Sequence, residues 1–258
     1  LLINLPSRSV EECHAEMEQR IKTDKQKPKE PEPSFTVAES KTTALHTPRT
    51  SDIKEYFSTV PRSLSIKFVG REETLDTLHE KLINLPAQKI LAVTSMGGQG
   101  KTELCIQYGK RYLLSYKGGI CWISAREGGI ARQILTFARA VGYEIKQKNQ
   151  TEEELLSEVW NAWRDENTLF IYDDVVELDP QLLPPDLERF TVLITTRDKE
   201  LGLNVENYPL DELPLPDALD LFGELITVDR LQKERVFGEK LITFVDGLPL
   251  GIELLGGY

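Results

Sequence analysis

The sequence predicts an α/β fold, a three-layer sandwich around a mostly parallel sheet, followed by the start of an all-helical subdomain. Short apolar runs alternate with helical patterns along most of the chain, and only helical patterns follow residue 216. Strands that alternate with helices at this spacing form a parallel sheet with helices on both faces. The predicted strands cover residues 90–94, 119–124, 169–172, 192–195 and 207–210.

Apolar residues repeat at helical spacing between and after these strands. The predicted helices cover residues 72–82, 101–114, 131–141, 155–163, 218–225 and 236–245. Thr151 precedes the acidic run 152–154 and is the expected N-cap of its helix. Trp122, Trp160 and Trp163 are expected in the core.

Three segments follow from this pattern. Residues 1–65 are expected to form a helix, around Val10 to Ile21, and then a disordered linker that is rich in Lys, Glu, Pro, Ser and Thr. Residues 66–212 are expected to form the α/β domain, and residues 213–258 the start of the helical subdomain.

The composition excludes some classes of partner and location. The 258 residues carry a net charge of −11, which would repel bulk nucleic acid and anionic membranes. No apolar run approaches the roughly 18 residues that span a bilayer. Three scattered cysteines without a CxxC spacing favour a reducing, cytoplasmic location over a disulfide framework or a zinc site. The chain starts at Leu1 without a signal pattern, and we expect it to be a piece of a longer protein.

A glycine-rich loop, SMGGQGKT at 95–102, connects the strand 90–94 to a helix. Small residues let the backbone wrap an anion, and the N-terminus of the helix favours the same negative charge. This pattern predicts a P-loop (Walker A) sandwich that binds the phosphates of a nucleotide. The loop residues expected at the phosphates are Gly97, Gly98, Gln99, Gly100, Lys101 and Thr102.

Within this loop, Lys101 is expected to reach the β- and γ-phosphates, and the Thr102 hydroxyl to ligate Mg²⁺. Ser95 stands where the usual pattern begins with glycine, a position that serves the turn rather than the chemistry. The alternative is a glycine-rich turn that happens to precede a lysine.

Two carboxylates end the apolar strand TLFIYDDV at 168–175. In a P-loop site such a carboxylate holds Mg²⁺, usually through water, and we assign this role to Asp173. Asp174 is then expected to orient or activate the attacking water. The alternative is a pair of acids in a solvated turn.

The next strand, VLITTRD at 192–198, leads into Thr195, Thr196 and Arg197. These residues are expected at the same carboxyl edge of the sheet, where open α/β sheets bind their ligands. Arg197 is therefore a candidate sensor of the γ-phosphate, and the alternative is an exposed surface arginine.

These elements, in this order, resemble the NB-ARC domain of the STAND class of P-loop NTPases over residues 66–258. FVGRE at 68–72 resembles the hhGRE motif of that family, which borders the adenine and implies Val69 and Arg71 there. GGQGKT is similar to the preferred loop GGxGKT. LDELPLPDALDLF at 210–222 resembles the segment that joins the nucleotide domain to the helical subdomain.

GLPLGIELLGG at 247–257 resembles the GLPL motif of the first helical subdomain, and its proline, here Pro249, is implied to touch the nucleotide. By itself a GLPL sequence is also a helix–turn signal, in which Gly247 ends one helix and Pro249 starts the next. The winged-helix subdomain, the MHD motif and the terminal repeat sensor of the family are absent from this sequence.

The resemblance implies a molecular switch in signal transduction, in defence or regulation, with ATP or ADP and Mg²⁺ as its ligands. Slow ATP hydrolysis would reset the switch, and the ATP state would self-associate. Sensor and effector segments would lie outside this sequence. Two other functions stay open: a P-loop ATPase with steady turnover, and a nucleotide-binding scaffold without hydrolysis, against which the intact Asp173–Asp174 pair argues mildly.

Overall fold

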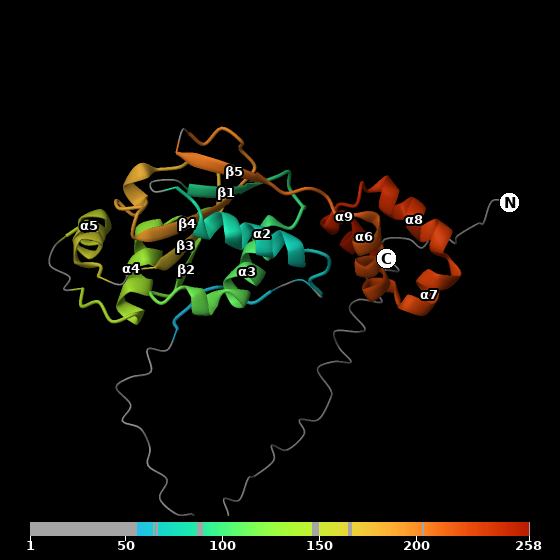
Figure 1. Ribbon diagram of the computed structural model, residues 1–258, viewed down its shortest axis with the longest axis horizontal. Helices are drawn as coiled ribbons and strands as arrows, with labels where there is room; N and C mark the ends of the chain where they lie inside the picture. The colour runs from blue at the N-terminus through green and yellow to red at the C-terminus, as the bar shows by residue number, and fades with distance from the viewer. Residues whose placement is uncertain are drawn as a thin grey trace, which may run out of the picture. The chain divides into compact units, whose positions relative to one another are not determined.

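The computed structural model describes residues 56–257 except 64, 66, 87–89, 146–149, 165–166 and 203. The predicted N-terminal helix and most of the predicted linker therefore lie outside the described residues. The described chain contains a five-stranded sheet in the order β2-β3-β4-β1-β5 (Figure 1). The strands are β1 Ile90–Thr94, β2 Ile120–Ser124, β3 Thr168–Val175, β4 Phe190–Thr196 and β5 Val205–Pro209. Every pairing between them is parallel, which confirms the predicted fold class.

The strand order decides which loops meet at the carboxyl edge. Strand β1 lies between β4 and β5, and β3 lies beside β4. Thr94 of β1 pairs with Thr196 of β4. The register between β3 and β4 shifts between Tyr172 and Val175. The ends of β1, β3 and β4 are consequently neighbours, and the shift falls on the two residues predicted to be functional carboxylates.

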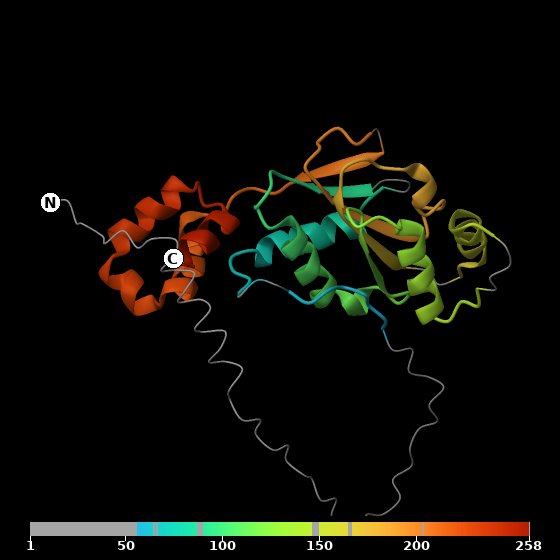
Figure 2. The same cartoon turned by 180° about the vertical axis from the view of Figure 1, so that it is seen from behind.

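Helices cover both faces of the sheet, as Figures 1 and 2 show from opposite sides. On one face, α2 (Glu72–Ile83) and α3 (Lys101–Arg111) pack on Leu91 and its neighbours. On the other face, α4 (Ile130–Ala140) and α5 (Glu152–Ala162) pack on Ala92 and its neighbours. Successive side chains of a strand point to opposite faces, which explains why one apolar run supplies both cores.

One predicted helix boundary needs correction. The helix expected to reach residue 114 ends at Arg111 and is followed by a 3₁₀ turn, Leu113–Ser115. A second 3₁₀ turn, Pro180–Leu182, follows β3. Thr151 is the N-cap of α5 as predicted, and Glu154 completes a capping box with it.

A short segment that the sequence assigned to the linker lies along the edge strand β2. The Thr59 amide donates to the Ile120 carbonyl at 3.0 Å, and the Ile120 amide donates to the Phe57 carbonyl at 3.0 Å. The Trp122 amide donates to Thr59 Oγ1 at 2.8 Å. This pairing depends on the exposed edge of a distant strand, so no local pattern in the sequence indicates it.

After β5 the described chain is helical, as predicted. Its helices are α6 Leu215–Ile226, α7 Val228–Lys233, α8 Arg235–Phe244 and α9 Pro249–Gly256. They share a core with Leu213, Leu219, Phe222, Ile242 and Ile252 among its buried residues. The sequence did not indicate α7, because this short helix buries no residue and therefore carries no apolar stripe. Within the described residues, no helix has both the length and the apolarity needed to cross a membrane.

Candidate functional site

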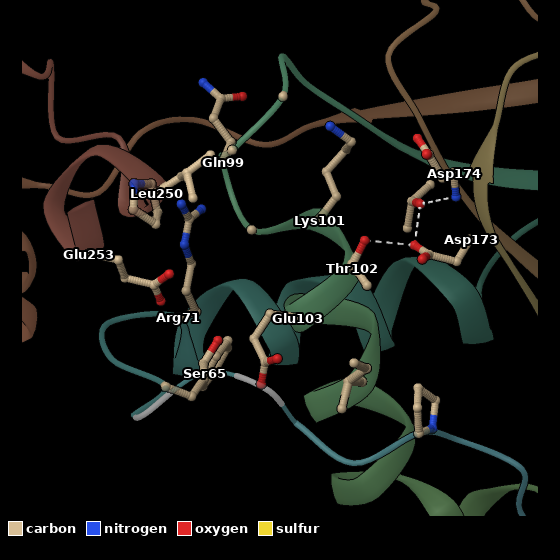
Figure 3. Close-up of a pocket in the computed structure, with 18 of the residues that line it drawn as sticks. Ser65, Arg71, Gln99, Lys101, Thr102, Glu103, Asp173, Asp174, Leu250 and Glu253 are labelled. Carbon is tan, nitrogen blue, oxygen red and sulfur yellow. Dashed lines mark hydrogen bonds between the residues drawn. The ribbon is translucent and has the colours of Figure 1, made fainter. Parts of the chain in front are cut away.

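A cavity of about 860 Å³ opens at the carboxyl edge of the sheet and reaches the helical part of the chain. It is lined by every residue that the sequence singled out as a site residue: Val69, Arg71, Gly97, Gly98, Gln99, Gly100, Lys101, Thr102, Asp173, Asp174, Arg197 and Pro249. The structure therefore brings together residues that are as far apart in the sequence as Val69 and Pro249. Figure 3 shows this cavity, with Lys101 and Asp173 toward one end and Arg71 toward the other.

The glycine-rich loop adopts a backbone that glycine permits. Gly98 and Gly100 have φ values of 85° and 87°, in the left-handed region where an L side chain is strained. Gly100 is also the N-cap of α3, so the first amides of this helix face the loop. The amide ends of this helix and the turn before it form a site that suits an anion.

Lys101 lies within this loop. Its ammonium donates to the carbonyl oxygens of Ser95 and Met96, both at 2.8 Å, and to Ser95 Oγ at 3.2 Å. The side chain is buried, and burial, with the positive charge of Arg197 as the next cause, lowers the pKa of its ammonium. Ser95, which replaces the usual glycine, thus takes part in holding the lysine.

Thr102 and Asp173 meet although 71 residues separate them. The Thr102 hydroxyl donates to Asp173 Oδ1 at 2.8 Å, and the Thr195 hydroxyl donates to the same oxygen at 2.7 Å (Figure 3). Burial raises the pKa of Asp173, and the two hydrogen bonds oppose that shift.

A hydroxyl and a carboxylate oxygen at one point suit Mg²⁺, which prefers oxygen ligands. The described residues hold no group of three His, Cys, Asp or Glu side chains that would bind a metal alone. The donor set therefore fits a Mg²⁺ ion that completes its shell with water and phosphate oxygens.

Asp174 has an unusual backbone for a residue with a side chain, with φ at 57°. Its amide donates to Thr195 Oγ1 at 2.8 Å, and its carboxylate lies 3.4 Å from Arg126 Nη1. Non-glycine residues in this region cluster at functional sites. The sequence did not single out Arg126. This arginine lies two residues after the end of β2. Arg197 has a similar place, two residues after the end of the predicted strand 192–195.

Arg197 lies against the loop although its side chain is exposed. A Cβ atom placed on Gly97 would lie 3.4 Å from the carbon and one nitrogen of the Arg197 guanidinium. The arginine thus faces the glycine-rich loop rather than extending away into solvent.

The other end of the cavity lies between α2 and the helical part. Arg71 is buried there, and its guanidinium donates to the Asp211 carbonyl at 2.7 Å. Burial lowers the pKa of Arg71. Val69 packs against the core of the helical part, and Pro249 occupies the first position of α9.

Several lining residues were missed by the sequence interpretation: Pro61, Arg62, Ser65, Glu103, Trp122, Arg126, Leu250 and Glu253. Trp122, expected in the core, is only partly buried and lines the cavity, because β2 is the edge strand on that side. Glu103 directly follows Thr102 in the sequence, and this neighbouring position could have indicated that it lines the cavity. The Glu103 carboxylate accepts hydrogen bonds from Ser63 and Gln107, both at 2.6 Å.

Comparison with known proteins identifies the family. The NB-ARC domain family matches residues 71–222, which is more than half of the chain. A probable disease resistance protein of Arabidopsis thaliana is 26% identical over 207 residues, covering 73% of this chain and 24% of that protein. The probable disease resistance protein RXW24L of the same plant is 24% identical over 225 residues, covering 79% of this chain and 25% of that protein. The chain thus spans about a quarter of the length of these relatives.

Among solved structures, the fold is similar to a Signal Transduction ATPase with Numerous Domains (STAND) protein with a tetratricopeptide repeat sensor from Pyrococcus horikoshii. The TM-score is 0.52 and the identity 22%, over 77% of this chain and 31% of that one. The glycine-rich loop, the order of strands in the sheet and the family match all indicate a P-loop fold. The chain belongs to the NB-ARC domain family of P-loop NTPases, whose members bind nucleotide, usually with Mg²⁺.

Proposed function

We propose that this chain is the nucleotide-binding part of an ATP/ADP-controlled switch in signal transduction. The observation that carries the proposal is the meeting of Lys101, Thr102 and Asp173 at one edge of the sheet, in a cavity that the helical part also lines. A ligand in this cavity touches both parts of the chain, so its identity can bias how they are arranged.

The loop amides of Gly97, Gly98, Gln99 and Gly100 would hold the phosphates, and Lys101 would donate to the β- and γ-phosphates. Thr102 and Asp173 would hold Mg²⁺, whose charge offsets that of the phosphates. At the other end of the cavity, Val69, Arg71 and Pro249 would border the adenine.

The switch itself rests on Arg197 and on the contact between the loop and the helical part. Arg197 lies beside Gly97, where it would donate to a γ-phosphate and so distinguish ATP from ADP. Gln99 donates to Glu212 at 2.7 Å, and the Leu250 amide donates to the Gly98 carbonyl at 3.2 Å. A change at the phosphates thereby reaches the segment around residue 212, where we place the boundary between the domains 66–212 and 213–258.

We infer slow hydrolysis that resets the switch, with Asp174 orienting the attacking water and Lys101 and Asp173 neutralising charge. ADP would favour a closed state, in which the nucleotide domain and the helical part are held together. ATP would favour an open state that self-associates. The disease resistance relatives support a role in defence. We further propose a cytoplasmic location, which the scattered cysteines favour, and sensor and effector segments outside this sequence.

The identity of the nucleotide that co-purifies with the protein, and calorimetry with ATP and ADP in the presence of Mg²⁺, test the nucleotide site. We expect bound ADP, and at least a 100-fold loss of affinity in Lys101→Met, an effect of about 3 kcal/mol. Lys110→Met, at the exposed end of the same helix, is the matched control and should bind like the unchanged protein. Absence of heat with either nucleotide would overturn the proposal.

Turnover measurements separate the switch from its two rivals. A switch hydrolyses ATP detectably but slowly, below about 1 s⁻¹, whereas steady turnover above that rate supports an ATPase that performs work. No hydrolysis at all, together with tight ADP binding, supports the scaffold.

A further inference from the structure

One buried hydroxyl connects the Asp173 carboxylate to the backbone amide of Asp174 at the end of β3. Thr195 of β4 is 1% exposed, and its Oγ1 donates to Asp173 Oδ1 at 2.7 Å. Thr195 Oγ1 also accepts a hydrogen bond from the Asp174 amide at 2.8 Å. A threonine hydroxyl has a single proton to donate, so these two hydrogen bonds fix its direction: it donates to Asp173 and accepts from Asp174.

This arrangement leaves part of the Asp173 carboxylate available. Thr102 and Thr195 both donate to Oδ1, and among the described residues no hydrogen bond to Oδ2 is formed. Two donors on one oxygen hold the plane of the carboxylate. The Asp174 amide, bonded to the same hydroxyl, is held at the point where the backbone turns through its left-handed φ of 57°.

The neighbouring threonine makes a useful comparison. Thr196 is equally buried, but its Oγ1 accepts the Asp198 amide at 3.0 Å and so serves the loop after β4. Adjacent residues of a strand point to opposite faces, which is why Thr195, and not Thr196, reaches the Asp173 carboxylate and the Asp174 amide.

We propose that Thr195 is a positioning residue that orients the Asp173 carboxylate for Mg²⁺ and sets the backbone of Asp174. Groups that hold a metal ligand in place usually change metal affinity 10- to 100-fold when they are removed. The proposal rests on the proposed nucleotide site. It adds that the degree to which Mg²⁺ strengthens ADP binding depends on one hydroxyl of the neighbouring strand.

The test measures ADP affinity by calorimetry across a series of Mg²⁺ concentrations and in EDTA. In Thr195→Val, which keeps the shape and removes the hydroxyl, the Mg²⁺ concentration for half-maximal enhancement of ADP binding should rise at least 10-fold. Thr195→Ser should restore it to within about 3-fold, because the hydroxyl returns. Thr196→Val should leave it unchanged, and ADP affinity in EDTA should be the same in all four proteins.

Two outcomes would overturn the proposal: an unchanged Mg²⁺ dependence in Thr195→Val, or an equal loss of ADP affinity with and without Mg²⁺, which indicates a general structural role. If the valine variant does not fold, Thr195→Ala is measured in the same way, since it also lacks the hydroxyl. Failure of the proposed function is distinct, because the unchanged protein would then bind no ADP under either condition.

Discussion

The amide of Leu250 donates a hydrogen bond to the carbonyl oxygen of Gly98 at 3.2 Å. Leu250 is the second residue of α9, and amides in the first turn of a helix have no acceptor within the helix. The glycine-rich loop supplies that acceptor. The loop and the GLPL segment are far apart in the sequence, and this hydrogen bond joins them directly.

Replacing Gly98 by alanine tests this contact. The new Cβ would lie 3.0 Å from Leu250 Cβ, and the backbone would keep a φ of 85°. A left-handed conformation costs an L residue roughly 1–2 kcal/mol, and the contact with Leu250 adds to that cost. We expect a loss of about 2–3 kcal/mol in the free energy of unfolding, measured by urea denaturation, together with weaker ADP binding.

Gly128→Ala is the matched control, because Gly128 has a similar φ of 73° and no atom within 4 Å of the added Cβ. It also lies outside the cavity and isolates the backbone cost. If Gly98→Ala were no less stable than Gly128→Ala, the close approach of α9 to the loop would be contradicted.

Trp122 is expected to report nucleotide binding by fluorescence. It is partly buried and lines the cavity, whereas Trp160 and Trp163 are buried in the core between the sheet and α5. Addition of ADP and Mg²⁺ should change the emission of the protein, and Trp122→Phe should remove most of that change. Trp160→Phe is the control and should keep the change, since Trp160 does not line the cavity. This substitution also removes no hydrogen bond of the Trp160 indole nitrogen among the described residues. A change that survives in Trp122→Phe would contradict this assignment.

The strands, the glycine-rich loop and the carboxylates were predictable because their signals are local. An apolar run of five residues such as 90–94 and a loop such as 95–102 reveal themselves without knowledge of the rest of the chain. Placing the carboxylates beside the loop needed one further rule, that the carboxyl ends of parallel strands meet at one edge. The structure brings these residues together along one cavity.

What could not be predicted depends on contacts between distant elements. The pairing of residues 57–59 with β2 needs the edge of a sheet that the segment itself does not encode. No local pattern distinguishes Arg126 from a surface arginine. Its position near Asp174 follows from the strand order, which puts β2 beside β3. Thr195 was expected at the correct edge, but its two partners depend on the register shift between β3 and β4.

The capping box of α5 gives a stability prediction from a feature that the sequence does reveal. The Glu154 amide donates to Thr151 Oγ1 at 3.2 Å, and the Thr151 amide donates to the Glu154 carboxylate at 3.0 Å. Thr151→Ala should lower the free energy of unfolding by about 1 kcal/mol, and Thr151→Ser by much less. Thr136→Ala, an exposed threonine within α4, should change it by no more than about 0.5 kcal/mol. An equal effect of the two alanine variants in thermal or urea unfolding would rule out the cap as the cause.

His79 connects α2 to α3 and gives a prediction about pH. Its Nδ1 lies 2.8 Å from Tyr108 Oη, which lies 2.6 Å from Tyr116 Oη, and its ring stacks on Tyr112 with centroids 3.7 Å apart. Burial lowers the pKa of His79 below its ordinary value of 6.5. The folded protein therefore resists protonation at this site, while the unfolded chain accepts a proton near pH 6.5.

Below about pH 6.5 the unfolded state binds more protons at this histidine than the folded state does. Protonation of His79 therefore lowers the free energy of unfolding as the pH falls through that range, and its stabilising contribution is complete above it. His79→Phe keeps an aromatic ring for Tyr112 but cannot titrate. We expect the free energy of unfolding to fall less between pH 7.5 and pH 5.5 in this variant than in the unchanged protein. The comparison between the two proteins cancels every other titrating group that the substitution leaves alone. An identical or steeper fall in the variant would mean that protonation of His79 does not oppose folding.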